Sequence, residues 1–376
     1  MKIAIVHDYL NSWGGAEAVV AALHEMFPDA PIYTSLYDEK LKEKVPVIAN
    51  WDIRAPKWLQ GKIFGRFPKY ITAILPLVFE SFDFSDYDLV ISSSAAFAKG
   101  VITRPQTLHI NYCHTPPRFL YGYRGETNKR DKWYWKPILY PLDSYLRLWD
   151  FAAAQRPNFI VANSETVKER IRKYYRREAT VIYPPIETAV VPATNYGLSR
   201  PARRDPASRW PTTNYFLVVS RLFAYKNVDL VVEACNRQKL PLKVAGAGAE
   251  GERLKHLAGP TVELLGFVSP EKLAELYAGC QALIVPTEDE DLGMTVIEAN
   301  AYGKPVLALR SGGLRETVVE GVTGDFFEKP TVESLAGKLG GFKAEKYLAD
   351  DCRKNSERFS KEKFKASFQD FIDRCL

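Results

Sequence analysis

Two Rossmann-like, doubly wound α/β domains with parallel sheets are the fold that this sequence predicts. The chain has 376 residues, enough for two domains that each bury a core of their own. Short apolar runs alternate with helical patterns along nearly the whole chain. A segment rich in proline, threonine, serine and arginine divides these patterns into two sets, which indicates one domain on each side of it.

The candidate strands are near-continuous apolar runs, as expected of parallel strands that helices cover on both faces. In the first half of the chain they span residues 2–7, 89–92, 108–112, 159–162 and 180–183. In the second half they span residues 215–220, 242–245, 262–265, 282–285 and 306–309. Their alternation with helices favours a doubly wound parallel sheet in each half.

The expected domain boundaries follow from this pattern. We place one domain at residues 1–190, a linker at 191–213 and a second domain at 214–359. After residue 327 the pattern is helical to the last residue, and we expect an amphipathic helix at about 360–376. Phe364, Phe368 and Phe371 recur at helical spacing and would form its apolar face.

The composition narrows the function classes. A hydrophobic fraction of 46% with 26% charged residues is typical of a globular protein, and no apolar stretch has the roughly 18–20 residues of a membrane-spanning helix. The first residues run directly into a strand pattern, so we expect no signal peptide. Five scattered cysteines without a CxxC spacing favour a reduced, cytoplasmic protein. The net charge of +6 suits anionic ligands or an anionic membrane surface.

Two cations follow the first strand of the second domain in "SRLFAYKN", residues 220–227. Arg221 can bind two phosphate oxygens at once and Lys226 adds a point charge, so together they suit a diphosphate. The alternative is that both are solvated surface cations. Their position at the carboxyl end of a strand favours ligand binding, because open α/β sheets bind ligands there.

Glycines follow the next two strands. In "VAGAGAE", residues 244–250, the spacing lacks the full dinucleotide-binding pattern, so a tight turn between strand and helix is the better interpretation. In "LLGFVS", residues 264–269, the strand ends at Gly266. The backbone at Val268 would then lie at the same sheet edge, where it could contact a flat base.

The stretch "TEDEDLGMTVIEANAYGKPVLA", residues 287–308, combines an acidic run with the start of a helix. Backbone N–H groups of Gly293, Met294 and Thr295 would form an anion site at the helix start. Glu298 would lie roughly 6 Å further along, where it could accept hydrogen bonds from ribose hydroxyls. Thr295 and Glu298 also match a capping box, which leaves a purely structural role open. The acidic run at 288–291 could be a solvated loop or a DxD-like metal site.

The first domain offers two further features. In "HDYLNSWGGAEAVV", Gly14 and Gly15 lie between the first strand and the first helix, where a flexible backbone suffices as an explanation. The absence of GxGxxG at this position disfavours a Rossmann dehydrogenase. In "INYCHTPPRFLYGY", His114 follows a strand and precedes two prolines. Arg118 and Tyr121 could bind an acceptor phosphate, and a surface role is equally compatible with them.

Basic and aromatic residues interleave at 54–79 and 128–148, which suits peripheral binding to an anionic membrane. Helices packed within the domain are the alternative. We expect no nucleic-acid partner, because no nucleic-acid-binding module accompanies the positive charge.

Together these motifs resemble the retaining glycosyltransferases of family four, once called glycosyl transferases group one, which have the two-domain GT-B fold. The family signature is a glutamate, seven residues and a second glutamate, here Glu290 and Glu298. The stretches "ANAYGKPVLA" and "SGGLRETVVEGVTGDFF" continue the pattern, and "SRLFAYK" and "YAGCQALIVPT" resemble it too. The resemblance covers nearly the whole chain.

The resemblance implies donor-binding roles in the second domain. Arg221 and Lys226 would hold the donor diphosphate, and Glu298 would bind the nucleotide ribose. Glu290 and the amides of residues 293–295 would contact the donor sugar and its phosphate. His114, Arg221, Lys226 and Glu290 are the expected catalytic set.

For the first domain, the resemblance implies that Gly14 and Gly15 lie in an interdomain cleft, near the diphosphate and the acceptor. His114 would hydrogen-bond the donor sugar. The C-terminal helix would pack back on the N-terminal domain. GT-B enzymes generally neutralise the leaving diphosphate with basic side chains and helix dipoles, so neither a catalytic metal nor a cofactor is expected.

One departure bears on the donor. The commonest family sequence has Gly and Phe where this chain has Asp291 and Leu292, and the acidic version is similar to members that use GDP-mannose. The resemblance therefore implies a retaining, front-face hexosyltransferase that uses GDP-mannose and a glycan or lipid-linked acceptor. It would lie in the cytoplasm or at the inner face of the cytoplasmic membrane. UDP-sugar donors, a nucleotide-sugar hydrolase or epimerase, and a non-catalytic glycan-pathway subunit stay open.

Overall fold

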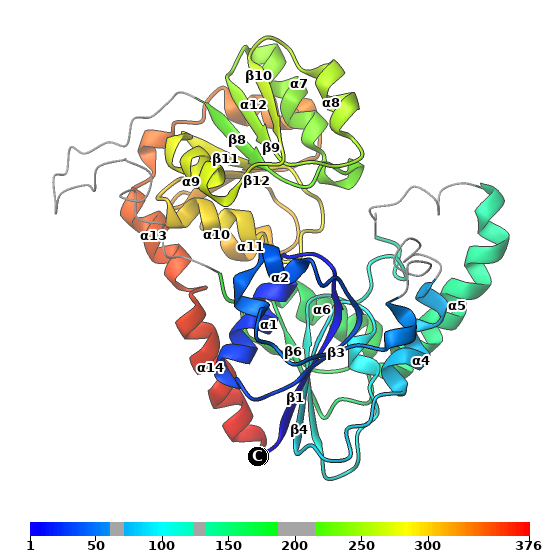
Figure 1. Cartoon of the computed structure of the whole chain (residues 1–376). Helices are drawn as coiled ribbons and strands as arrows, with labels where there is room; N and C mark the ends of the chain where they lie inside the picture. Colours follow the sequence, from blue (N-terminus) through cyan, green and yellow to red (C-terminus); the bar gives the residue numbers. More distant parts are fainter. Residues whose placement is uncertain (61–70, 124–132, 187–214) are drawn as a thin grey trace. The chain divides into compact units, whose positions relative to one another are not determined.

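The computed structural model describes residues 1–60, 71–123, 133–186 and 215–376 (Figure 1). These residues form two compact units. The N-terminal unit contains residues 1–185 together with 361–376, and the C-terminal unit contains residues 186–360. The predicted linker at 191–213 lies outside the described residues. Among the described helices, none has the length and apolarity needed to cross a membrane.

The N-terminal unit contains a seven-stranded parallel sheet in the order β3-β2-β1-β4-β5-β6-β7. The strands are β1 (Ile3–Leu10), β2 (Ile32–Tyr37), β3 (Ile53–Arg54), β4 (Leu89–Ser94), β5 (Leu108–Cys113), β6 (Phe159–Ala162) and β7 (Thr180–Val181). The helices around it are α1 (Gly15–Met26), α2 (Leu41–Lys44), α4 (Leu75–Glu80), α5 (Lys136–Ala153), α6 (Glu165–Tyr175) and α14 (Lys361–Cys375).

Alternation along the strands gives this sheet two apolar faces. Ile5 packs in a cluster with residues of α1 and α14, whereas its neighbours Ala4 and Val6 pack in a cluster with residues of α4 and α5. Phe364 and Phe368 of α14 lie in the first cluster. The sequence prediction that the C-terminal helix packs on the N-terminal domain is thereby confirmed, and Figure 1 shows α14 beside α1.

The C-terminal unit contains a six-stranded parallel sheet in the order β10-β9-β8-β11-β12-β13. The strands are β8 (Phe216–Val219), β9 (Leu242–Ala245), β10 (Val262–Gly266), β11 (Ala282–Val285), β12 (Val306–Leu309) and β13 (Gly324–Phe327). The helices are α7 (Val228–Gln238), α8 (Gly251–Leu257), α9 (Pro270–Gly279), α10 (Met294–Ala301), α11 (Leu314–Thr317), α12 (Val332–Leu339) and α13 (Ala349–Glu357).

The predicted strands are all present, and the prediction of two doubly wound parallel sheets is confirmed. Sequence analysis missed β2, β3 and β13. Strand β2 carries the polar pair Thr34 and Ser35, both fully buried, which interrupts the apolar run. Ser35 satisfies its hydroxyl by donating to the carbonyl oxygen of Asp8 at 2.6 Å, so a polar residue is tolerated in the interior.

In each sheet the strand order reverses once, between β1 and β4 in the N-terminal unit and between β8 and β11 in the C-terminal unit. Open α/β sheets bind ligands at the carboxyl ends of the strands beside such a reversal. The sequence-predicted site residues follow these strands or their neighbours in each unit, except Val268, which follows the edge strand β10.

Candidate functional site

Lys226 and Glu290 form an ion pair beside the strand-order reversal of the C-terminal sheet. Lys226 ends the short 3-10 turn Ala224–Lys226 that follows β8, and Glu290 lies in the loop after β11. Lys226 Nζ lies 2.7 Å from Glu290 Oε2, and the two side chains are 13% and 21% exposed. The structure thus brings together a cation and a carboxylate that the sequence assigned separately to the diphosphate and the sugar.

Two glycines hold the loop that carries Glu290. A Cβ atom on Gly312 would lie 2.3 Å from the carbonyl oxygen of Glu290, and one on Gly313 would lie 2.4 Å from that of Asp291. The Gly313 amide also donates to the Glu290 carbonyl oxygen at 2.8 Å. This close approach requires residues without side chains. The glycines of "SGG" therefore fix the backbone position of the acidic loop.

Further contacts fix the ends of this loop. Asp289 adopts a left-handed backbone with a φ of 53°, and its amide donates to Ser311 Oγ at 2.9 Å. Asn227, also left-handed at 52°, donates from Nδ2 to the Pro286 carbonyl oxygen at 3.3 Å. The segment after β8 is thereby tied to the segment after β11.

Helix α10 begins directly after Gly293, which has a φ of 88° and precedes the first helical residue, Met294. The first N–H groups of a helix have no acceptors within that helix, so the amides of Met294 and Thr295 suit an anion. Gly293, not Thr295, is the N-cap residue, and Thr295 is already inside the helix. The capping-box interpretation is therefore wrong, because Glu298 lies too far along α10 to bond back to the N-cap.

Glu298 instead pairs with Tyr277 of α9, whose hydroxyl donates to Glu298 Oε2 at 2.6 Å. Burial raises the pKa of Glu298, and the bond from Tyr277 opposes that rise. The Tyr277 ring stacks on Tyr302 with centroids 5.5 Å apart. Tyr277 belongs to the stretch "YAGCQALIVPT", and sequence reasoning gave it no role because no spacing rule links α9 to α10.

Arg221 lies at the carboxyl end of β8, exposed, with its guanidinium 5.8 Å from the Phe223 ring centre. Val268 follows β10, two strands from β8, beside the left-handed Gly266. A Cβ atom on Gly246 would lie 1.8 Å from the Ser220 carbonyl oxygen, so the glycines after β9 serve close backbone packing. This favours the tight-turn interpretation of "VAGAGAE".

Among the described residues, no three histidine, cysteine, aspartate or glutamate side chains gather in an arrangement that could hold a metal ion. The acidic run at 288–291 therefore forms no such cluster.

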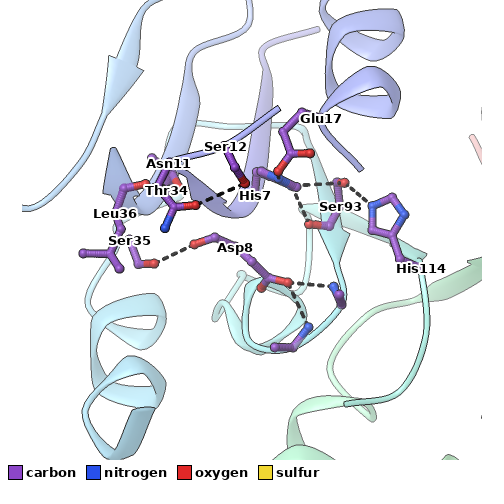
Figure 2. Close-up of polar contacts among 12 residues, drawn as sticks. His7, Asp8, Asn11, Ser12, Glu17, Thr34, Ser35, Leu36, Ser93 and His114 are labelled. Carbon is purple, nitrogen blue, oxygen red and sulfur yellow. Dashed lines mark hydrogen bonds and ion pairs between the residues drawn. The ribbon is translucent and has the colours of Figure 1, made fainter. Parts of the chain in front are cut away.

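In the N-terminal unit, His114 belongs to a chain of polar contacts at the carboxyl ends of β1, β4 and β5 (Figure 2). Its Nε2 lies 2.7 Å from Ser93 Oγ, and Ser93 Oγ lies 3.2 Å from His7 Nδ1. His7 Nε2 faces Glu17 Oε1 at 3.6 Å. Although His114 is partly exposed, burial lowers its pKa to about 3, and the neighbouring His7 adds to the effect. His114 is therefore neutral at pH 7.

Gly14 and Gly15 lie where β1 leads into α1. Gly14 is the N-cap residue, with an extended backbone that any residue can adopt. A Cβ atom there would lie 3.3 Å from Glu17 Oε2, so glycine leaves room for that carboxylate. The need for a flexible backbone at Gly14 is therefore not confirmed, and contact with Glu17 explains the residue instead.

Tyr121 and Arg118 occupy an aromatic region. The Tyr121 hydroxyl donates to Asp150 Oδ2 at 2.8 Å, and its ring stacks on Tyr174 with centroids 4.2 Å apart. Arg118 lies over Tyr123 at 5.5 Å. Since its hydroxyl already binds a buried carboxylate, Tyr121 has a structural role that sequence reasoning did not foresee.

Sequence reasoning also missed Asp8, which is 2% exposed in the same sheet. Its carboxylate accepts four backbone N–H groups at 2.6–2.8 Å, from residues 95–98 after β4. Figure 2 shows the Asp8 carboxylate pointing into this turn. No local signal could have revealed it, because the turn lies far from Asp8 in the sequence.

Two families match this chain, one for each domain. Residues 13–190 match Glycosyltransferase Family 4, and residues 200–359 match Glycosyl transferases group 1. Together the matches span most of both units.

Several curated proteins are similar to the chain. The uncharacterized glycosyltransferase MJ1178 of Methanocaldococcus jannaschii is 27% identical over 54% of this chain and 56% of its own length. D-inositol 3-phosphate glycosyltransferase of Geodermatophilus obscurus is 33% identical over 39% of this chain and 37% of its own length. The chain thus spans about half or less of these two relatives. Alpha-1,3/1,6-mannosyltransferase ALG2 of Mus musculus is 25% identical over 90% of each chain.

Solved structures share the fold over the full chain. Anabaena Alr3699/HepE in complex with UDP has a TM-score of 0.67 and 17% identity, covering 100% of both chains. The lipopolysaccharide outer core galactosyltransferase WaaB has a TM-score of 0.65 and 19% identity over the same share. With a family match on each domain and the fold shared with these structures, the chain belongs to the GT-B glycosyltransferases.

Proposed function

We propose that this chain transfers mannose from GDP-mannose to a glycan or lipid-linked acceptor, with retention of configuration at the sugar. The observation that carries the proposal is the Lys226–Glu290 pair beside the strand-order reversal, with Arg221 after the same strand as Lys226. A diphosphate and the sugar attached to it need a cation and a hydrogen-bond acceptor close together. The similarity to alpha-1,3/1,6-mannosyltransferase ALG2 over 90% of the chain supports mannose.

The proposed reaction is a front-face displacement. The acceptor hydroxyl oxygen forms a bond to the anomeric carbon while the bond from that carbon to the β-phosphate oxygen breaks. The hydroxyl proton passes to a phosphate oxygen of the departing GDP. Negative charge therefore grows on the diphosphate, where Arg221, Lys226 and the amides of residues 293–295 would stabilise it.

The remaining residues would position the two substrates. Glu298, oriented by Tyr277, would accept hydrogen bonds from the ribose hydroxyls, and the backbone at Val268 would contact the base. Glu290 and His114 would contact the mannose. Gly15 would contact both the donor and the acceptor. Gly14 and Arg118 would contact the acceptor. Tyr121 would support the acceptor site through its packing.

A UDP-sugar donor is the second candidate, because Anabaena Alr3699/HepE was solved with UDP and with UDP-glucose. Thermal-shift measurements with GDP-mannose, UDP-glucose and UDP-GlcNAc separate the two. We expect GDP-mannose to give the largest stabilisation, and Lys226→Ala to abolish it. Lys272→Ala, which removes a surface cation paired with Glu275, is the matched control and should bind normally.

Three other results would each favour a different function or donor. A thermal shift with UDP-sugars alone would show that the donor is a UDP-sugar. Release of free mannose without an acceptor would favour a hydrolase. Failure to bind any nucleotide-sugar would favour a non-catalytic subunit.

We further propose that the exposed face of α5 contacts an anionic membrane that carries the acceptor. Tyr140, Tyr145, Leu148 and Phe151 on this face are 61%, 48%, 74% and 39% exposed. Both acidic residues of α5 are buried, so its exposed face carries no negative charge. Exposed tyrosines beside apolar side chains suit the lipid–water interface. The predicted membrane stretches also include residues 61–70 and 128–132, which lie outside the described residues.

Co-sedimentation with vesicles tests this contact. We expect binding to phosphatidylglycerol vesicles, weaker binding to phosphatidylcholine vesicles, and a loss of about fivefold or more on Leu148→Ser. Leu348→Ser in the C-terminal unit, where the side chain is 65% exposed, is the control and should bind as the wild type does. Equal binding by both variants would contradict the proposal, as would self-association of the chain through α5.

A further inference from the structure

The polar chain at the carboxyl end of the N-terminal sheet determines where protons lie. It runs from Glu17 through His7 and Ser93 to His114 (Figure 2). His7 is 3% exposed and Ser93 is fully buried, so water does not satisfy these groups. Each hydrogen must therefore go to a protein atom, and the directions of the bonds can be assigned.

The first assignment concerns His7. Its Nδ1 lies 3.1 Å from the carbonyl oxygen of Ser93 and 3.2 Å from Ser93 Oγ. A carbonyl oxygen can only accept a hydrogen bond, so His7 Nδ1 carries the proton. Glu17 Oε1 lies 3.6 Å from His7 Nε2, beyond hydrogen-bond distance, so the shorter contact of Nδ1 with the carbonyl oxygen decides this assignment.

The second assignment concerns Ser93. Its hydroxyl faces the N–H of His7, to which it can only be an acceptor. Among the described residues, His114 Nε2, at 2.7 Å, is the remaining hydrogen-bond partner of Ser93 Oγ. The Ser93 hydroxyl therefore donates to His114 Nε2. That nitrogen must be unprotonated, and the proton of the neutral His114 ring resides on Nδ1.

We propose that Ser93 and His7 are positioning residues that hold His114 as an Nδ1–H donor, so that it binds an oxygen acceptor of the substrate. The ligand chemistry is a hydroxyl oxygen or a charged oxygen. Within the proposed function, on which this assignment of the ligand rests, it would be a hydroxyl of the transferred sugar. Burial keeps the ring neutral by lowering the pKa of His114 to about 3, which leaves a single proton to place.

Nitrogen NMR of the histidine rings in the full chain tests the tautomer without any substrate. The chain has five histidines, and His114→Gln assigns the His114 signals by their loss. At pH 7.5 we expect His114 to show a protonated Nδ1 and an unprotonated Nε2. Ser93→Ala should give a mixture of both tautomers or a protonated Nε2, whereas Ser93→Thr, which keeps the hydroxyl, should restore the wild-type spectrum.

The His7 variants separate the chemistry from the packing. Asn places an amide N–H near the position of Nδ1, so His7→Asn should keep the His114 tautomer, and His7→Ala should loosen it. A protonated Nε2 on wild-type His114 overturns the proposal. So does an unchanged His114 spectrum in a folded Ser93→Ala variant.

Kinetics then connect the tautomer to sugar transfer. Ser93→Ala should lower kcat/KM about tenfold, and Ser93→Thr should recover most of the loss. A donor whose sugar lacks the contacted hydroxyl should react slowly with the wild type and lose less to Ser93→Ala. If the NMR result holds but no sugar is transferred, the proposed function fails and the tautomer assignment stands. If Ser93→Ala loses activity while the His114 tautomer is unchanged, the tautomer assignment is wrong and the proposed function stands.

Discussion

Lys226 and Glu290, the cation and the carboxylate proposed to bind the donor, neutralise each other across 2.7 Å in the ligand-free chain. Both are largely buried at the same sheet edge, and the two glycines of "SGG" hold the backbone beneath Glu290. A diphosphate that binds Lys226 must share it with, or take it from, this carboxylate. We therefore propose that the pair sets the affinity of the site for a nucleotide without its sugar.

Removing the negative charge of Glu290 should tighten the binding of GDP. Glu290→Gln leaves Lys226 without its charged partner, and we expect the Kd for GDP to fall about 3–10-fold while sugar transfer falls at least about tenfold. Isothermal titration with GDP measures the first effect. Glu275→Gln, which breaks the surface pair with Lys272, is the control and should leave both values unchanged. Weaker GDP binding by Glu290→Gln would contradict this role of the pair.

Glu298→Gln should weaken ribose recognition with little loss of stability. Glutamine can still accept the hydrogen bond from the Tyr277 hydroxyl. The variant also removes a carboxyl group whose pKa is raised by burial. We expect Tm to change by less than about 3 °C and the preference for GDP over its 2′,3′-dideoxy analogue to fall about tenfold. Tyr277→Phe should reduce the same preference less, because it removes only the group that orients Glu298. A preference that survives Glu298→Gln would show that the carboxylate does not bind ribose.

Replacing Gly312 should disturb both the fold and the site. A Cβ atom there would clash with the Glu290 carbonyl oxygen, and the φ of 53° is strained for any side chain. We expect Gly312→Ala to lower the free energy of unfolding by about 1–3 kcal/mol and to weaken donor binding. Gly337→Ala is the matched control, since it lies inside α12 with open space around its Cβ position. It should stabilise the chain by up to about 1 kcal/mol, and equal effects of the two variants would refute the packing argument.

Acid should destabilise the chain through its neutral buried histidines. Burial lowers the pKa of His109 and of His114 to about 3, below the value near 6.5 in the unfolded chain. As the pH falls below about 6.5, the unfolded chain binds protons that the folded chain does not. Stability is therefore complete above pH 6.5 and is lost progressively toward pH 3, by about 1.4 kcal/mol per pH unit for each histidine.

Urea unfolding at several pH values between 7.5 and 4.5 measures this dependence. His114→Gln should reduce the slope by the share of one histidine. An unaltered slope in His114→Gln would show that His114 binds its proton at the same pH in the folded and the unfolded chain.

Local patterns were sufficient for most of the fold. Apolar runs located the strands of both sheets except β2, β3 and β13, and the spacing of Phe364, Phe368 and Phe371 located the apolar face of α14. These signals are readable because burial on both faces of a strand, or on one face of a helix, imposes a period on neighbouring residues. Strand β2 escaped because its buried serine bonds to the backbone of β1, and no local period records such a partner.

The sequence by itself determined the two-domain α/β class and which residues carry the charges of the candidate site. Only the tertiary structure decided what those residues touch. The Lys226–Glu290 pair joins positions 64 apart, and His114 meets Ser93 across 21 residues. The capping box failed because the start of α10 depends on the left-handed Gly293 and its surroundings. Parallel strands separated by helices bring distant loops to one sheet edge, so contacts there depend on strand order, which short sequence patterns do not encode.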